Sequence, residues 1–181
     1  MLRTILTGLA LTLTAAPGAA KPDAPAGQSA PTPQLTYVFS VRAEVAPAIE
    51  QGSIDGGRRR FIAITGGTVY GPRLQGVVLP GGGDWQVIKD GGVTSILARY
   101  FLRSTDGAVI EITNPGVRVA SPEVIEQLAR GEAVDPSRYY FRTTPKFATS
   151  AKQHDWLHRA VFVARGIRRP DHVVIDYFLV E

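Results

Sequence analysis

The folded part of the chain begins with a long alternation of apolar and polar side chains. From Leu35 to Val45 an apolar residue stands at every second position, with mainly polar residues between. This period of two is typical of a strand that buries one face. We therefore predict that the domain opens with a long strand whose apolar face consists of Leu35, Tyr37, Phe39, Val41, Ala43 and Val45.

Apolar or alternating runs continue to the C-terminus, and turn residues separate them. Asp90-Gly91 and Asp106-Gly107 supply the positive φ angles that tight hairpin turns require, and Gly66-Gly67 marks another turn. Neighbouring strands should therefore be antiparallel. Together with the opening strand, the runs predict about nine strands, the others being Arg60 to Ile64, Leu74 to Leu79, Trp85 to Ile88, Val93 to Arg103, Ala108 to Thr113, Tyr139 to Thr143, Arg159 to Ala164 and His172 to Val180.

One segment reads as a helix. Ser121 can cap it, Pro122 suits its first turn and Gly131 can end it, while apolar residues between them share one face. A single short helix among so many strands favours an all-β fold, an antiparallel barrel.

The hairpin around Asp106-Gly107 suggests what such a barrel contains. With a two-residue turn, Arg103 would face Ile110 and Tyr100 would face Thr113, so neither face of the hairpin is purely polar or purely apolar. A sandwich buries a uniformly apolar face, whereas a barrel with a ligand in its lumen needs apolar walls and a few polar groups. The pattern therefore favours a ligand-holding barrel.

The N-terminus has the order of an export signal. Arg3 precedes an apolar stretch, and small residues end it at Ala20; the stretch of about 12 residues is shorter than the roughly 20 that a membrane span needs. We predict a signal peptide at 1–20, a flexible Pro/Ala-rich linker at 21–34 and a barrel domain at 35–181. The protein should be periplasmic or secreted, without a membrane span.

The amino-acid composition limits the classes of partner that the protein can bind. The chain has 20 Lys and Arg against 16 Asp and Glu, a formal charge of +4, which loss of Arg3 with the signal would lower to +3. This mild excess argues against nucleic acid as a partner, and the run Arg58 to Arg60 would alternate between strand faces. The absence of cysteine excludes disulfides and thiolate metal sites. We expect a small-molecule partner, and a homo-oligomer stays open.

A glycine-rich loop provides the first candidate for chemistry. Pro80 to Gly83 lead into Asp84 and Trp85, and the Lys-Ser/Thr ending of a phosphate loop is missing. The glycines let backbone approach a ligand, so Asp84 is a candidate general base. The alternative is that Asp84 accepts backbone amides within the turn and Trp85 belongs to the core.

A second candidate lies in the run Tyr139 to Thr143. In a strand, Tyr140 and Arg142 share one face, and Tyr139, Phe141 and Thr143 share the other. An inward Arg142 would need a carboxylate partner or an anionic ligand, with Tyr140 as a proton donor beside it. An outward Arg142 would be an ordinary solvated side chain, and periodicity does not choose between these faces.

The region around Trp156 offers weaker signals. His154 and His158 are four residues apart, a zinc-binding spacing on a helix, but no third ligand stands in a recognisable pattern, so we expect no metal and no other cofactor. Trp156 is predicted as a plug at a barrel end, with a ligand wall as the alternative. No serine or cysteine hydrolase pattern is present.

Three segments, Arg60 to Gly71, Gly76 to Trp85 and Tyr139 to Phe147, resemble an uncharacterised bacterial and fungal barrel family. The family carries a domain-of-unknown-function label, is lipocalin-like and includes the 4-hydroxylaminobenzoate lyase type of enzyme. The resemblance covers Leu35 to the C-terminus. It implies a set of pocket residues: Arg60, Tyr70, Asp84, Trp85, Tyr100, Tyr140, Arg142 and Trp156.

The chain departs from the family pattern at two positions and in its export signal. Ala63 stands where the family has proline, and His158 stands where it has asparagine; a pocket-lining His158 would change the substrate. One hypothesis is a cofactor-independent lyase or isomerase for a small aromatic or phenolic acid, with Asp84, Tyr140 and Arg142 as catalytic residues. The other is a non-catalytic periplasmic binding barrel that uses the same pocket.

Overall fold

A computed structural model describes residues 30–181, and the predicted signal peptide and residues 21–29 of the predicted linker lie outside these residues. Residues 30–34 have no regular structure, and the first strand begins at Leu35. The strands are β1 (Leu35–Val45), β2 (Ile49–Ile54), β3 (Gly57–Tyr70), β4 (Gly76–Val78), β5 (Gly82–Lys89), β6 (Val93–Ser104), β7 (Val109–Val119), β8 (Tyr140–Thr143), β9 (Lys146–Ala148), β10 (Val161–Arg168) and β11 (His172–Val180). The helices are α1 (Pro122–Ala129) and the short 3-10 helices η1 (Asp90–Gly92), η2 (Pro136–Arg138) and η3 (Lys152–Leu157).

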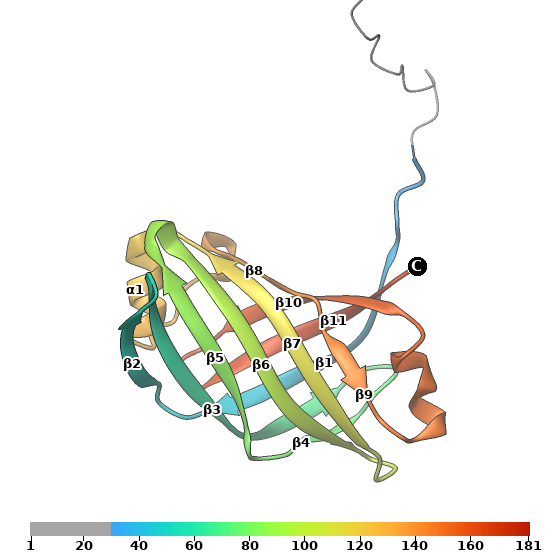
Figure 1. Cartoon of the computed structure of the whole chain (residues 1–181). Coiled ribbons are helices and arrows are strands. Elements are labelled where there is room, and N and C mark those ends of the chain that lie inside the picture. The colour runs from blue at the N-terminus through green and yellow to red at the C-terminus, as the bar shows by residue number, and fades with distance from the viewer. Residues whose placement is uncertain (1–29) are drawn as a thin grey trace, which may run out of the picture. The chain divides into compact units, whose positions relative to one another are not determined.

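Eight of these strands close into an antiparallel barrel (Figure 1). In chain order they are β1, β3, β5, β6, β7, β8, β10 and β11; each pairs with the next, and β11 returns to pair with β1. The barrel is therefore a simple up-and-down meander, without crossovers. Three further strands lie outside this closed path. The strand β2 pairs with β3, β4 pairs with both β3 and β6, and β9 pairs with β7.

The predicted all-β antiparallel barrel is confirmed, but the described chain has 11 strands instead of about nine. The sequence prediction missed β2 and β9. All six residues of β2 are exposed, so this strand buries no face and leaves no alternation to detect. The strand β9 has only three residues, too few to show a period.

The predicted register of the β6–β7 hairpin is wrong by one residue. Leu102 pairs with Ile110 and Arg103 with Val109, because the turn has three residues instead of two. Ser104 N donates to Ala108 O at 2.9 Å, and Gly107 has a φ of 89° beside the closing pair. A three-residue loop with a left-handed glycine is a common hairpin closure. In the true register, buried residues face buried ones.

One end of the barrel is filled by aromatic side chains. Phe39 stacks on Tyr177 with ring centroids 4.7 Å apart, and Phe147 meets Phe162 at 5.1 Å. Trp156 lies 5.7 Å from Phe162, and the Arg73 guanidinium is 3.9 Å from the Trp156 ring centroid. We call Phe39, Phe147, Trp156, Phe162 and Tyr177 the aromatic plug. The sequence had suggested a plug for Trp156.

The helix α1 forms where the sequence predicted a helix. The Ser121 side chain accepts a hydrogen bond from Val124 N at 3.3 Å, and Pro122 occupies the first turn. Its apolar face buries Val124, Ile125 and Leu128. Between residues 30 and 181, no helix is long and apolar enough to span a membrane.

Candidate functional site

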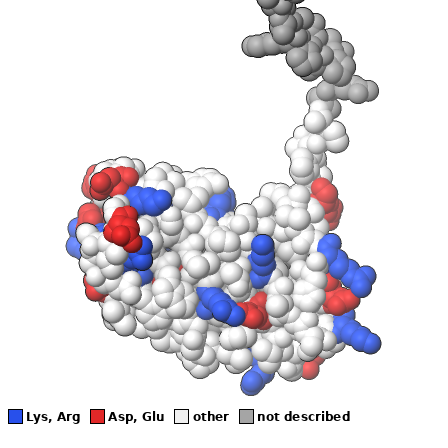
Figure 2. Space-filling model, viewed as in Figure 1, with Lys and Arg blue, Asp and Glu red and all other residues white. Residues whose placement is uncertain are grey.

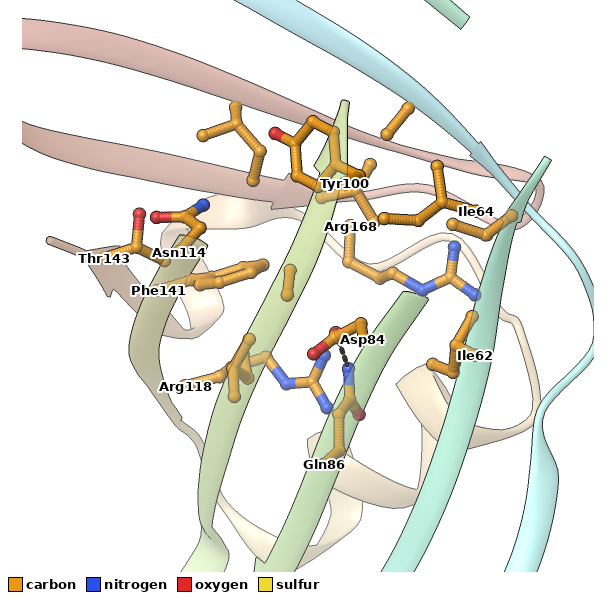
Figure 3. Close-up of a pocket in the computed structure, with 16 residues that line it drawn as sticks. Ile62, Ile64, Asp84, Gln86, Tyr100, Asn114, Arg118, Phe141, Thr143 and Arg168 are labelled. Carbon is orange, nitrogen blue, oxygen red and sulfur yellow. Dashed lines mark hydrogen bonds between the residues drawn. The ribbon is translucent and has the colours of Figure 1, made fainter. Parts of the chain in front are cut away.

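A cavity lies inside the barrel (Figure 3). The space open to the centre of a water molecule is about 40 Å³, several times what one water requires. Half of the lining residues are aliphatic, and polar side chains enter the wall from β5, β6, β7, β8 and β10. The lining residues are Ala43, Val45, Ile62, Ile64, Asp84, Gln86, Ile96, Ala98, Tyr100, Asn114, Arg118, Phe141, Thr143, Arg168, Val173 and Ile175.

Asp84 and Gln86 enter the cavity from alternate positions of β5. Gln86 Nε2 donates to Asp84 Oδ2 at 2.5 Å, and Gln86 Oε1 accepts from Arg60 Nε at 2.9 Å. Asp84 Oδ1 is buried without a hydrogen-bond partner. Burial raises the pKa of the Asp84 carboxyl, although the Gln86 amide and the charges of Arg118 and Arg60 oppose the shift. A carboxyl with a raised pKa is suited to exchanging protons.

Arg118 extends from β7 into the same space. Its side chain is 1% exposed, and its Nε and Nη2 atoms are buried without a hydrogen-bond partner. The structure gives it no carboxylate within 4.0 Å; its guanidinium carbon lies 6.0 Å from the centre of the Phe141 ring. Burial, together with the charge of Arg60, lowers the pKa of Arg118 to about 10, so it remains a cation at neutral pH. A buried cation without a partner in the protein could pair with an anion.

Arg168 approaches from β10 (Figure 3). Its Nη1 donates to the carbonyl oxygens of Arg169 and His172, the latter at 3.2 Å, and its backbone amide donates to Tyr139 Oη at 3.0 Å. Burial lowers the pKa of Arg168, and the charge of Arg60 adds to this effect. With Arg60 and Arg118, it makes three guanidinium groups around one carboxyl.

Neutral polar groups complete the wall. Asn114 Oδ1 and Thr143 Oγ1 are buried without a hydrogen-bond partner. Gly116 lies opposite Thr143, and a Cβ there would come 2.4 Å from Thr143 Cγ2. The Tyr100 hydroxyl instead meets the Tyr177 hydroxyl at 2.7 Å, and burial raises the pKa of Tyr100 well above its ordinary value. Tyr100 therefore forms part of the cavity wall, and its hydroxyl stays protonated near neutral pH.

The glycines before Asp84 allow close packing around the site. A Cβ at Gly82 would lie 2.4 Å from Tyr100 Cβ, and one at Gly83 would lie 2.1 Å from Phe61 Cε2. The first contact is inside the barrel and the second is outside it, under the Phe61 ring. The predicted close approach of this loop is thus to the protein itself.

Three predicted site residues are part of this interior. Asp84 and Tyr100 line the cavity, and Arg60 lies behind Gln86 with 3% of its side chain exposed. Tyr140 and Arg142 are on the outside of the barrel, because the bulky Phe141 and Thr143 take the inward positions of β8. The Arg142 guanidinium carbon lies 5.1 Å from the Tyr140 ring centroid. The expected set of Asp84, Tyr140 and Arg142 is therefore not brought together.

The other predicted site residues also lie away from the cavity. Tyr70 and Trp85 are 46% and 48% exposed on the outer face, where Trp85 packs on Phe61 at 5.0 Å. Trp156 belongs to the aromatic plug, and His158 Nε2 accepts from Thr149 N at 3.0 Å. Because His158 does not line the cavity, its departure from asparagine leaves the cavity unchanged. Among residues 30–181, no group of three His, Cys, Asp or Glu side chains could hold a metal.

Sequence reasoning missed Gln86, Asn114, Arg118 and Arg168. The predicted strand Ala108 to Thr113 ended at Asn114-Pro115, whereas β7 continues to Val119. Alternation gave the opposite signal for Arg118, since it stands between Val117 and Val119, a pattern that predicts an exposed arginine, whereas Arg118 is 1% exposed and Val119 is 38% exposed. On the face shown in Figure 2, acidic and basic side chains are interspersed, so the excess of arginine over carboxylate inside is a local property of the cavity.

Comparison with known proteins shows to which family the chain belongs. The profile of the family described as "Protein of unknown function (DUF3237)" matches residues 33–180. The chain belongs to the DUF3237 family. A UPF0311 protein of Rhodopseudomonas palustris is 40% identical over 146 residues, which are 81% of this chain and 95% of the relative.

Solved structures of other proteins share the barrel. The crystal structure of a conserved protein of unknown function from Rhodopseudomonas palustris has a TM-score of 0.81 at 39% identity, covering 84% of this chain and 100% of the other. A β-barrel like protein of Acinetobacter baumannii has a TM-score of 0.73 at 38% identity, with 86% and 100% covered. An enzyme from Penicillium herquei has a TM-score of 0.64 at 22% identity over 86% of this chain and 99% of its own; it shares the fold.

Proposed function

We propose that the barrel binds a small aromatic or phenolic acid and acts on it as a cofactor-independent lyase or isomerase. One observation carries the proposal: the buried, unpaired guanidinium of Arg118 lines the same cavity as the Asp84 carboxyl, whose pKa burial raises. The first group can hold an anion and the second can move a proton. Around them the wall is mostly apolar, which suits an aromatic ring.

Arg118 takes the role that the sequence had suggested for Arg142. Its guanidinium would bind the carboxylate or phenolate oxygen of the ligand, and Arg168 would add positive charge from β10. Asp84 as a carboxylic acid would give its proton to one atom of the ligand, or to the leaving group of a lyase reaction. As a carboxylate it would then remove a proton from another atom, so that its own proton is restored and no electron acceptor is needed.

The fold and the family are consistent with this proposal. An eight-stranded up-and-down barrel is the architecture of lipocalins, which hold a small ligand in the lumen. The resemblance to the 4-hydroxylaminobenzoate lyase type points to the same ligand class. The space of about 40 Å³ is smaller than the roughly 150 Å³ of a cavity that binds benzene, so a single-ring ligand would have to move the lining side chains apart.

The second candidate is a non-catalytic binding barrel of the periplasm. The observation that favours it is the buried Arg118 in a largely apolar wall, which would hold an aromatic anion without any role for Asp84. The predicted signal at 1–20 adds an exported location to both candidates. Cell fractionation of the full chain, with N-terminal sequencing of the product, tests for processing after Ala20.

Replacing Asp84 with asparagine separates the two candidates. Purified protein is incubated with benzoate, 4-hydroxybenzoate and 4-hydroxylaminobenzoate; products are followed by chromatography and binding by calorimetry. An enzyme should form product that Asp84→Asn abolishes while binding remains. A binding barrel should bind and form no product in either protein. The matched control is Asp90→Asn, an exposed aspartate of η1. Product formation unchanged in Asp84→Asn would refute the catalytic role.

A further inference from the structure

In and around the cavity, positively charged groups, which attract an anion, outnumber negatively charged groups, which repel one. Arg118 and Arg168 line it, and Arg60 lies just behind Gln86. Among the described lining residues, Asp84 is the only carboxyl. Glu50, the acidic neighbour of Arg60, lies at 3.9 Å on the exposed strand β2 and also pairs with Arg58. An anionic ligand would therefore neutralise charge that the protein itself leaves unpaired.

The carboxylate of Asp84 would repel any anionic ligand in this cavity. Its Oδ2 accepts from Gln86, whereas Oδ1 has no donor, and the cavity is small. A ligand carboxylate that pairs with Arg118 must then lie close to the Asp84 carboxyl. Two carboxylates in contact repel each other unless a proton lies between them, as in paired catalytic aspartates.

We infer that the cavity takes up one proton with each carboxylate ligand, and that Asp84 carries this proton. The protonated Asp84 would donate a hydrogen bond to the ligand oxygen that Arg118 does not hold. The inference rests on the proposed function in assuming that the cavity binds aromatic acids, and it adds the protonation state of the complex. The preferred ligand is therefore a carboxylate, because its second oxygen is free to accept the hydrogen bond from Asp84.

The surroundings of Asp84 support this assignment of the proton. The charged and titratable groups that face it are Arg60 from β3, Tyr100 from β6, Arg118 from β7 and Arg168 from β10. The strands β1, β8 and β11 contribute apolar side chains and Thr143 to the wall. The arginines stay charged and Tyr100 stays neutral near pH 7, because burial raises the pKa of Tyr100 and leaves that of Arg118 at about 10. Asp84 is the group left to accept a proton.

Calorimetry of benzoate and benzamide binding tests the inference. Binding is measured from pH 5 to pH 9 in pairs of buffers with different ionisation enthalpies. Benzoate should bind with proton uptake, and its Kd should rise by about tenfold per pH unit once Asp84 must be protonated for binding. Benzamide, which offers its own N–H donor to Asp84, should bind without proton uptake.

Variants locate the proton and the anion. Asp84→Asn should bind benzoate with no dependence on pH, because an asparagine amide imitates the neutral acid. Arg118→Met should lose benzoate binding at every pH, whereas Arg142→Met, on the outer face, should bind as the unmodified chain does. Benzoate binding without proton uptake, or an unchanged pH slope in Asp84→Asn, overturns this inference alone. Failure of every aromatic acid to bind overturns the proposed function and this inference with it.

Discussion

Gln86 holds Asp84 and Arg60 with its two amide atoms at once. Its Nε2 donates to Asp84 Oδ2 at 2.5 Å, while its Oε1 accepts from Arg60 Nε at 2.9 Å. Since the donor faces the carboxyl and the acceptor faces the cation, only one orientation of the amide satisfies both neighbours. Gln86 therefore fixes the direction of the carboxyl without itself carrying charge.

Replacement of Gln86 by leucine should destabilise the barrel. Arg60 Nε and Asp84 Oδ2 would both lose a buried partner, and each unsatisfied group costs about 1–3 kcal/mol. Urea unfolding monitored by tryptophan fluorescence measures the effect. The matched control is Gln75→Leu, because Gln75 is exposed and donates one long bond to Gly71 O. Equal stabilities of the two variants would contradict the buried role of Gln86.

Asp84→Asn should change how stability depends on pH. The folded protein binds the Asp84 proton more tightly than the unfolded chain, because burial raises the pKa of this carboxyl above its unfolded value of about 3.9. The unmodified chain should lose stability as the pH rises from about 4 through the folded pKa, by about 1.4 kcal/mol per unit of displacement. Asp84→Asn should lack this loss and melt higher than the unmodified chain at pH 8. A lower melting temperature at pH 8 would contradict the direction of the shift.

Arg118→Met should stabilise the protein while removing its anion site. The arginine is 1% exposed with two unpartnered nitrogen atoms, and since burying one ion costs several kcal/mol, an apolar side chain of similar volume should be more stable by about 1 kcal/mol or more. Chemical denaturation at pH 7 gives the change in the free energy of unfolding. The control is Arg142→Met, which should change stability by about 0.5 kcal/mol or less because the side chain is on the outer surface. A clear loss of stability in Arg118→Met would mean that the cation has a structural partner.

Gly82→Ala and Gly83→Ala should both destabilise, but only the second should be rescued. A Cβ at Gly83 meets the ring of Phe61, whereas one at Gly82 also lies 2.7 Å from the backbone oxygen of Arg99. Overpacking of this kind costs about 1–3 kcal/mol. Adding Phe61→Ala should recover much of the Gly83→Ala loss, because the ring can be removed, and a double-mutant cycle measures this coupling. If the stability losses of Gly83→Ala and Phe61→Ala simply add in the double variant, the Phe61 ring is not the reason that position 83 requires glycine.

Much of the barrel could be predicted from local sequence. The alternation in Leu35 to Val45, the turns at Asp90-Gly91 and Asp106-Gly107 and the Ser121 cap act over a few residues, so they reveal strands, antiparallel neighbours and the helix α1. The turn predicted at Gly66-Gly67 was wrong, because both glycines lie inside β3. The strand β2 could not be found in this way, because its stability depends on pairing with β3 and on no buried face of its own. The hairpin register also failed, since one extra loop residue shifts every pair.

The sequence by itself determined that Asp84 stands beside glycines in a strand and that Arg142 shares a face with Tyr140. Only the tertiary structure decided which faces turn inward. A period of two separates a strand into two faces but does not say which one the closed barrel encloses. Phe141 and Gly166 settle this for β8 and β10, because a Cβ at Gly166 would lie 2.4 Å from the Phe141 ring, so the bulky side chain of one fits only beside the missing side chain of the other. Closure of the eight strands then brings Arg118 to Asp84, which lie 34 positions apart in the chain, and leaves Arg142 outside.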